Sequence, residues 1–494
     1  MTPPPRRYAV VGAGWAGLAA ALELRRRGHV VHLYEAARMP GGRARRAAGT
    51  KDGAALDNGQ HILLGAYSAT LGLIRELGLD AGALLHRERL ALCAADGSFA
   101  LRAAALPAPF HLLGGLALAH GLSVRERIGV ARQIVRLRQA GWRAGNSAGS
   151  GGVRDGSSRS EGGRMGDTIS AIKGNALSAE QWLQAGGQSP RAIERLWRPL
   201  CIAALNTPPA EASAQLLANV LRDSVGTGAA ASDILIPRVD LSSLWPDAAI
   251  TRLGAGSIPS SWAGAHAAAP AMSAVFMGRT VRTLAAAAGS VLVDGQPYDG
   301  VVIAANVPPA RRLLHQLPDT PGGAAFLAML DAFDFIPIAT LSLRLARPWG
   351  LRAPMQMLWE DPTRLAFGQW LFDHSALRTT RTQGHPSVHI VVSDARALLR
   401  HDADAVTRGI IAQVREQAGA QAPMPEVMAD TLIVEKRATF KAAPGLARPP
   451  NTTPWPNVWV AGDWTDTGYP GVLEGAVRSG QEAARRASCP PRRA

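Results

Sequence analysis

The chain has 494 residues, of which 47% are hydrophobic and 18% are charged. This composition excludes an intrinsically disordered chain, and the length allows a core that needs no disulfide or metal. The excess of 53 Lys and Arg over 38 Asp and Glu gives a net charge of +15, which favours anionic partners. The chain is rich in Ala, Gly and Arg and has few Lys, so we attribute the larger share of the net charge to compositional bias. Because the basic residues are dispersed and no aromatic platform accompanies them, we expect no nucleic-acid partner.

The chain contains three widely spaced cysteines, Cys93, Cys201 and Cys489, and no CxxC pair. This pattern argues against a disulfide framework and against a zinc or iron–sulfur site, so no metal is predicted. It favours a reducing, cytoplasmic compartment.

Residues 8–34 predict a strand, a helix and a second strand, which is the start of a parallel sheet. Gly12, Gly14 and Gly17 form a GxGxxG pattern at the first strand-to-helix turn. The first glycine permits the turn, the second lets the backbone approach a pyrophosphate, and the third lets helix and strand pack closely. Glu35 ends the second strand, where its carboxylate can accept hydrogen bonds from an adenosine ribose, so FAD or NAD fits better than NADP.

The segment 103–122 is apolar but contains prolines, histidines and glycines, so it predicts an interfacial or substrate-channel segment rather than a membrane span. A helix is predicted over 124–140. The stretch that follows is dense in Gly, Ser and Arg and predicts a disordered insertion over 143–166. Further helices are predicted over 178–183 and 190–200.

The second half of the chain alternates between strands and helices. Strands are predicted in one sheet over 275–281, 291–293 and 301–305, and in a second sheet over 336–344 and 388–393. A helix over 404–418, a buried strand over 458–461 and a helix over 471–486 complete the chain.

Two further motifs separate FAD from NAD. Gly42 and Arg43 follow Glu35 closely, and an arginine there can reach the same pyrophosphate. Gly462 and Asp463 follow the last strand and precede a glycine-spaced helix start. The aspartate suits a ribityl hydroxyl, and the helix N-terminus suits the flavin pyrimidine carbonyl.

The blocks 12–43 and 462–480 resemble the two ends of the flavin amine oxidase/phytoene desaturase superfamily. The resemblance implies an α/β fold in which a Rossmann-like FAD-binding domain of the amine oxidase type is interwoven with a mixed-sheet and helical substrate domain. It implies FAD-binding segments 5–65, 250–310 and 430–489, and substrate-binding segments 66–249 and 311–429. The cofactor-binding residues that it implies are Gly12, Gly14, Trp15, Ala16, Gly17, Glu35, Ala36, Gly42, Arg43, Gly59, Gln60, His61, Val281, Gly462, Asp463, Gly471 and Val472.

The block 56–67, with the sequence LDNGQHILLGAY, resembles the hydroxysqualene dehydroxylases, also called squalene-associated FAD-dependent desaturases. The blocks 196–207 and 468–476 support this resemblance. It implies reduction of hydroxysqualene to squalene in hopanoid precursor synthesis, with hydride from reduced flavin and a dry, apolar channel for the C30 chain. Residues 107–122 and 326–338 supply apolar side chains for such a channel.

Loss of the substrate hydroxyl needs a proton donor, and His61, Tyr67 and Tyr469 are the candidate catalytic residues. His61 has an ordinary pKa in the useful range, but it could equally be a loop histidine bonded to backbone. Tyr67 could be a half-buried core residue. Asp57 and Glu474 are expected to be structural, as a loop contact and a helix cap.

Other functions remain open at this point. A carotenoid desaturase or an amine oxidase could use the same scaffold, and a prenylated-protein escort protein would bind an isoprenoid without redox chemistry. The electron donor is not identified by any motif. We expect a cytoplasmic protein with peripheral contact to the inner face of the membrane, where hydroxysqualene partitions.

Overall fold

The computed structural model describes residues 4–47, 56–145, 177–254, 272–374, 377 and 386–489. The predicted insertion at 143–166 lies outside these residues from position 146 onward. Within the described ranges, no helix has both the length and the hydropathy to cross a membrane.

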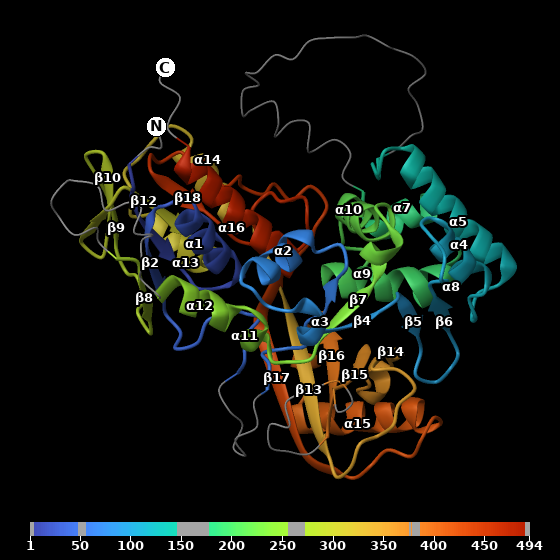
Figure 1. Cartoon of the computed structure of the whole chain (residues 1–494). Coiled ribbons are helices and arrows are strands. Elements are labelled where there is room, and N and C mark those ends of the chain that lie inside the picture. The colour runs from blue at the N-terminus through green and yellow to red at the C-terminus, as the bar shows by residue number, and fades with distance from the viewer. Residues whose placement is uncertain are drawn as a thin grey trace, which may run out of the picture.

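A parallel sheet of five strands forms one half of the molecule (Figure 1). Its order is β18-β12-β1-β2-β8, and every neighbouring pair is parallel. The sheet is confirmed as Rossmann-like, because β1 leads through a helix into the adjacent β2. The strands are β1 (Arg7–Val11), β2 (Val30–Glu35), β8 (Ala274–Met277), β12 (Gly300–Ile303) and β18 (Val458–Val460).

Two helices from opposite ends of the chain pack together on this sheet. These are α1 (Trp15–Arg26) and α16 (Leu473–Ser488), which run side by side in Figure 1. They approach so closely that a Cβ on Gly480 would lie 2.0 Å from the carbonyl oxygen of Ala16. The smaller elements of this half are α12 (Pro246–Gly254), α13 (Val307–Leu314), α14 (Gly323–Asp331), and an antiparallel meander of β9 (Leu284–Ala287), β10 (Ser290–Val293) and β11 (Gln296–Tyr298).

Two strand predictions differ from the structure. The strand expected over 275–281 ends at Met277, because Gly278 turns the chain with φ +70°. Val281 therefore lies in the loop beyond β8. The strand expected over 291–293 is β10 of the separate meander rather than a member of the parallel sheet.

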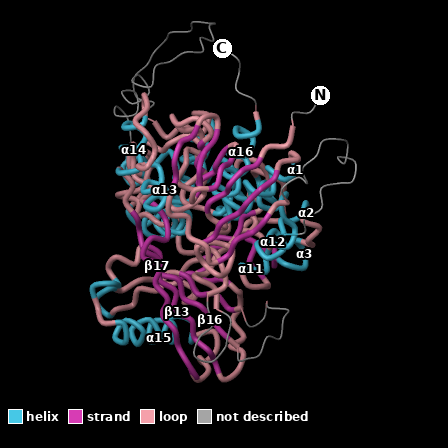
Figure 2. The backbone as a smooth tube through the Cα atoms, turned by 90° about the vertical axis from the view of Figure 1, so that its left-hand side faces the viewer, coloured by secondary structure: helices cyan, strands magenta, loops and turns pink. Residues whose placement is uncertain are grey.

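The second half contains an antiparallel sheet in the order β14-β15-β16-β13-β17 (Figure 2). One face packs on α15 (Ala403–Gly419) through Leu341 and Leu343 of β13. Because side chains alternate along a strand, Ile338 and Thr340 point to the opposite face. The strands are β13 (Phe335–Leu345), β14 (Met355–Met357), β15 (Trp370–Asp373), β16 (Ser387–Ser393) and β17 (Val427–Phe440).

The domain boundary predicted at residue 430 falls inside β17, which pairs with β13 along most of its length. A helical layer completes this half (Figure 1). Its elements are α4 (Phe110–Ala117), α5 (Val124–Gln139), α7 (Ala179–Ala185), α8 (Pro190–Ala192), α9 (Arg198–Leu205) and α10 (Ala214–Val225), with the short strands β5 (Ala91–Cys93) and β6 (Ala100–Arg102). The remaining elements pack mainly against α1, α12 and α16; they are α2 (Ser68–Glu76), α3 (Ala81–Leu84), α11 (Leu241–Leu244), β3 (Leu63–Leu64), β4 (Leu85–Glu88) and β7 (Ile234–Pro237).

Candidate active site

A cavity of about 920 Å³ joins the carboxyl ends of the parallel strands to the face of the second sheet that is turned away from α15. Every cofactor-binding or catalytic residue predicted from the sequence lines this cavity except Gly17. The sequence reasoning therefore selected residues that the fold brings together, although they lie in segments hundreds of positions apart.

The turn between β1 and α1 has the shape of a phosphate cradle. Gly12 has φ +110°, and a Cβ there would lie 2.7 Å from the carbonyl oxygen of Ala304. A Cβ on Gly42 would lie 2.9 Å from the Cα of Gly14, so this backbone is open only to glycine. No side chain caps α1, whose N-terminus therefore suits an anion. Gly17 does not face the cavity, because a Cβ there would meet the Gly12 carbonyl oxygen at 1.8 Å.

Glu35 and Arg43 are both fixed by the fold. The Glu35 carboxylate accepts hydrogen bonds from the backbone N–H of Ala13 at 2.6 Å and of Ala37 at 2.7 Å. These bonds hold it at the end of β2, where a ribose would need it. Arg43 forms an ion pair with Asp463, with 2.6 Å between Nη2 and Oδ1. The two cofactor motifs at opposite ends of the chain are thus joined directly, which neither motif predicts.

Two tyrosines face the same part of the cavity. Tyr67 lies near Tyr469 and Glu474, and burial raises its pKa above the ordinary value. Burial and a hydrogen bond to the Asp223 carboxylate raise the pKa of Tyr469. Both phenols therefore stay protonated at neutral pH. The O–H of Tyr469 is donated to Asp223, whereas Tyr67 can donate into the cavity.

The imidazole of His61 lines the cavity with Nδ1 3.3 Å from the carbonyl oxygen of Gly59. Burial lowers its pKa to about 4, and the charge of Arg43 adds to this effect, while the Gly59 hydrogen bond opposes it. His61 is therefore neutral near pH 7, which differs from the ordinary pKa that the sequence analysis assigned. Its single N–H is donated from Nδ1 to the Gly59 carbonyl, so Nε2 is an acceptor and the ring carries no spare proton.

The low pKa of His61 predicts an effect on acid stability. Its folded pKa of about 4 lies below the unfolded value, so the unfolded chain binds more protons in the window between them. The free energy of unfolding therefore decreases as the pH falls, because protonation of this histidine favours the unfolded chain. We expect the wild type to lose about 2 kcal/mol more free energy of unfolding between pH 7 and pH 5 than His61→Gln, by denaturant titration. Parallel losses in both proteins would contradict the assignment.

Thr340 is a cavity residue that the sequence analysis missed. Its side chain is 1% exposed, and Oγ1 has no hydrogen-bond partner among the described residues. A Cβ on Gly59 would lie 3.8 Å from this oxygen and 3.6 Å from Cε1 of His61, so the two side chains converge there. Period-two alternation in 336–344 places 338 and 340 on one face, but it does not say which face meets the cavity.

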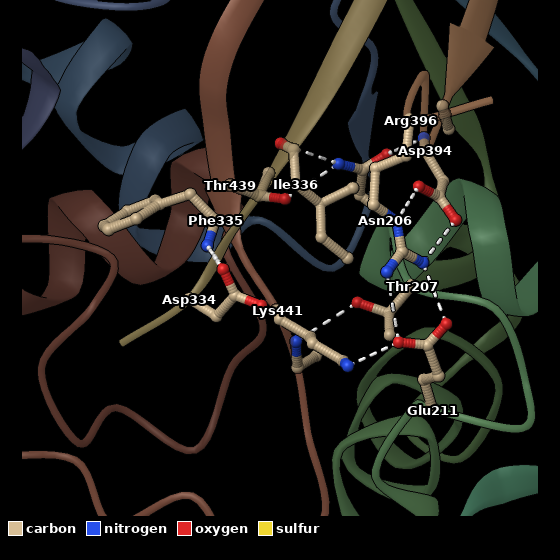
Figure 3. A network of polar contacts seen from close by, with 12 residues as sticks. Asn206, Thr207, Glu211, Asp334, Phe335, Ile336, Asp394, Arg396, Thr439 and Lys441 are labelled. Atoms are coloured by element: carbon tan, nitrogen blue, oxygen red, sulfur yellow. Dashed lines mark hydrogen bonds and ion pairs between the residues drawn. The ribbon is translucent and has the colours of Figure 1, made fainter. Parts of the chain in front are cut away.

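A polar network supports the floor of the cavity (Figure 3). Asn206 ends α9 in the left-handed conformation and donates from Nδ2 to Oγ1 of Thr439 at 2.9 Å. Its Oδ1 accepts from the backbone N–H of Asp394 at 2.9 Å. Arg396 bridges the carboxylates of Asp394 and Glu211, and Lys441 also pairs with Glu211. The hydrogen bond from Arg396 and the two cations lower the pKa of Glu211 to about 2. The network thereby fixes the end of α9 to the second sheet.

Two expected structural roles are confirmed. Asp57 accepts a hydrogen bond from the backbone N–H of Leu241 at 2.9 Å. Glu474 is fully buried and accepts from the backbone N–H groups of Ala69 and Thr70, each at 3.0 Å. Glu474 therefore caps α2 from a distant helix and fixes the position of Tyr67 just before it.

The far arm of the cavity is lined almost entirely by apolar side chains. They come from α4, α5, α9, α10 and the second sheet, and include Leu112, Leu116, Val130, Ile134, Leu200, Val220, Met355, Trp370 and Phe372. Of the predicted channel segment 326–338, only Ile338 lines the cavity, because Phe326 packs against Trp455 instead.

Comparisons with known proteins agree with this geometry. The family profile of flavin containing amine oxidoreductases matches residues 15–488. Hydroxysqualene dehydroxylase of Rhodopseudomonas palustris is 29% identical over 491 residues, covering 96% of each chain. Zeta-carotene desaturase of Arabidopsis thaliana is 22% identical and covers 97% of this chain and 85% of its own. Putrescine oxidase bound to putrescine has a TM-score of 0.63 at 18% identity, covering 98% of this chain and 99% of its own.

The chain therefore belongs to the flavin containing amine oxidoreductase family. It is an FAD-dependent oxidoreductase, and the glycine cradle, Glu35 and the Arg43–Asp463 pair fit that cofactor. Within the family, the resemblance to hydroxysqualene dehydroxylases is confirmed, since three curated relatives of that name match at 26–29% identity over nearly the whole chain.

Proposed function

We propose that the chain reduces hydroxysqualene to squalene, supplying a precursor for hopanoid synthesis. The observation that carries the proposal is the continuity of one cavity, which runs from the dinucleotide cradle into a long apolar arm. A C30 hydrocarbon fits such an arm because its surface needs no polar partners. The similarity to hydroxysqualene dehydroxylases selects this substrate among hydrocarbons.

In the proposed reaction the allylic C–O bond breaks, a C–H bond forms, and the hydroxyl leaves as water after taking up a proton. When bound and reduced, FAD supplies the hydride. The apolar arm excludes bulk water from the carbon that loses its hydroxyl. Thr340 and Tyr67 supply hydrogen-bond donors around the cavity, and these donors would assist the departing oxygen.

Thr340→Val tests one of these donors. We expect turnover of hydroxysqualene to fall about tenfold at unchanged FAD content, because a hydrogen bond to the departing oxygen is lost. The thermal midpoint should not fall, since the hydroxyl has no partner in the protein fold. Thr340→Ser keeps a hydroxyl and should restore most of the turnover. Equal turnover in wild type and Thr340→Val would remove Thr340 from the reaction.

The proposed function is tested by anaerobic single turnover. The purified protein is reduced with dithionite, freed of excess reductant and mixed with hydroxysqualene in detergent. Flavin reoxidation with stoichiometric squalene supports the proposal. Persistent reduced flavin without squalene would contradict it, and the oxidised protein would then be tested on carotenoid precursors, because zeta-carotene desaturases are also similar over the full chain.

We propose a cytoplasmic location with peripheral contact to the membrane that dissolves the substrate. Free Cys93, Cys201 and Cys489 are consistent with a reducing compartment. The reductant of the flavin would be a separate partner.

A further inference from the structure

The large hydrophobic side chains that are exposed gather in one region of the described chain. Seven of them lie between residues 106 and 135, whereas Met272, Leu399 and Met428 are scattered elsewhere. The most exposed of these seven are Leu118 at 84%, Val124 at 67% and Phe110 at 58%. We call this region the apolar patch; it comprises Leu106, Phe110, Leu113, Leu118, Val124, Ile128 and Val135. A concentration of this kind on a folded protein marks an interaction surface.

The apolar patch lies over the far arm of the cavity. It is formed by α4, α5 and their flanking residues, which lie together at the edge of the molecule away from the parallel sheet (Figure 1). The opposite sides of the same two helices line the cavity with Leu112, Leu116, Val130 and Ile134. Each helix is therefore apolar on two sides. One side lines the cavity, whereas the side that carries the apolar patch has no contact within the described residues that accounts for it.

Positive charge accompanies the apolar patch. Arg125, Arg132, Arg136 and Arg138 are exposed on α5. None of these four pairs with a carboxylate of the described residues, and Glu126 is occupied in capping α5 through Ser123. Apolar side chains beside unneutralised arginines are complementary to anionic headgroups above an acyl layer.

We propose that the apolar patch and the α5 arginines dock on an anionic lipid bilayer, and that the cavity exchanges its hydrocarbon with the acyl layer between α4 and α5. The exchange rests on the proposed function, whereas the docking rests on the surface alone. The helices would lie in the plane of the interface, since α4 has only eight residues. Docking on a protein partner would not require the cavity to lie directly behind the docking site. Docking on a membrane would require it, because a water-insoluble substrate must pass from the bilayer into the cavity.

The test measures co-flotation of the FAD-loaded protein with vesicles of phosphatidylcholine, with or without phosphatidylglycerol. We expect flotation with the anionic vesicles that declines with salt. Phe110→Ser/Leu113→Ser/Leu118→Ser should lower the partition coefficient at least tenfold. Arg125→Gln/Arg132→Gln/Arg136→Gln should lower it roughly a hundredfold at low salt, at about fivefold per arginine.

Matched controls change the same residue types elsewhere on the surface. Met272→Ser/Leu399→Ser/Met428→Ser removes three other exposed apolar side chains, and Arg400→Gln/Arg408→Gln/Arg415→Gln removes three exposed arginines near or on α15. Both should float like the wild type. FAD content and turnover in detergent report whether each variant is folded.

Three outcomes would overturn the inference: no flotation of the wild type, equal losses in the control variants, or patch variants that float normally. A dimer that only the apolar variant dissociates, without vesicle binding, would also overturn it and assign the patch to a second copy of the chain. Normal flotation without conversion of hydroxysqualene in detergent would instead reject the proposed function and leave the docking intact.

Discussion

Gly12→Ala is expected to yield a protein that retains less than a tenth of the FAD bound by the wild type. The residue has φ +110°, which costs an alanine about 1–3 kcal/mol, and the new Cβ would stand 2.7 Å from a backbone carbonyl oxygen of β12's following residue, Ala304. Relief of that contact must move either the cradle turn or the end of the neighbouring strand. Both line the cofactor cavity. The measurement is the ratio of flavin to protein absorbance after purification, followed by titration with added FAD.

Gly97→Ala provides the control for this variant. Gly97 also has a positive φ of +77°, but nothing lies within 4 Å of the position of a new Cβ. This change should lower stability by about 1 kcal/mol and leave FAD binding unchanged. Equal FAD content in Gly12→Ala and wild type would show that the turn can move to accommodate the methyl group without loss of binding. It would contradict the conclusion that the geometry of the cradle determines FAD affinity.

Glu474→Ala is expected to lower the free energy of unfolding by about 3 kcal/mol. The fully buried carboxylate accepts four hydrogen bonds, from the backbone of Ala69, from the backbone and hydroxyl of Thr70, and from Arg478. Its removal leaves the first N–H groups of α2 without their cap. The ion pair with Arg478 adds little, since that arginine is 41% exposed. Chemical denaturation followed by circular dichroism measures the loss.

Glu482→Ala changes the same residue type on the same helix. The Glu482 side chain is 36% exposed to solvent, and among the described residues its carboxylate pairs only with Arg485 and Arg486. Its loss should cost less than about 0.5 kcal/mol. If the two variants were equally stable, the cap on α2 would contribute no more than a surface ion pair.

The sequence predicts most of what depends on neighbours along the chain. The spacing of Gly12, Gly14 and Gly17 specifies the βαβ cradle, because the backbone packs so closely at Gly12 and Gly17 that a side chain would not fit. The long strand β13 and the helix α15 follow from their periodicity, with bounds close to those predicted.

The missed features depend on distant contacts. The ion pair of Arg43 with Asp463 joins residues 420 positions apart, and each motif had suggested a different contact with the cofactor. Thr340 became a candidate only because the cavity meets one face of β13. The low pKa of His61 results from burial, which the residue type cannot reveal.

The order of strands in the parallel sheet has a consequence for biosynthesis. The edge strand β18 and the helix α16 that packs on α1 are built from residues 458–488, far along the chain from β1, α1 and β12. A nascent chain can pair β1 with β2 early, but the flank of β12 and one surface of α1 stay uncovered until residues 458–488 have been synthesised. Contacts that close so large a loop form slowly and leave hydrophobic surface open to aggregation. We therefore expect chaperone dependence to be greatest for this late step, and a supply of FAD during expression to improve the yield of native protein.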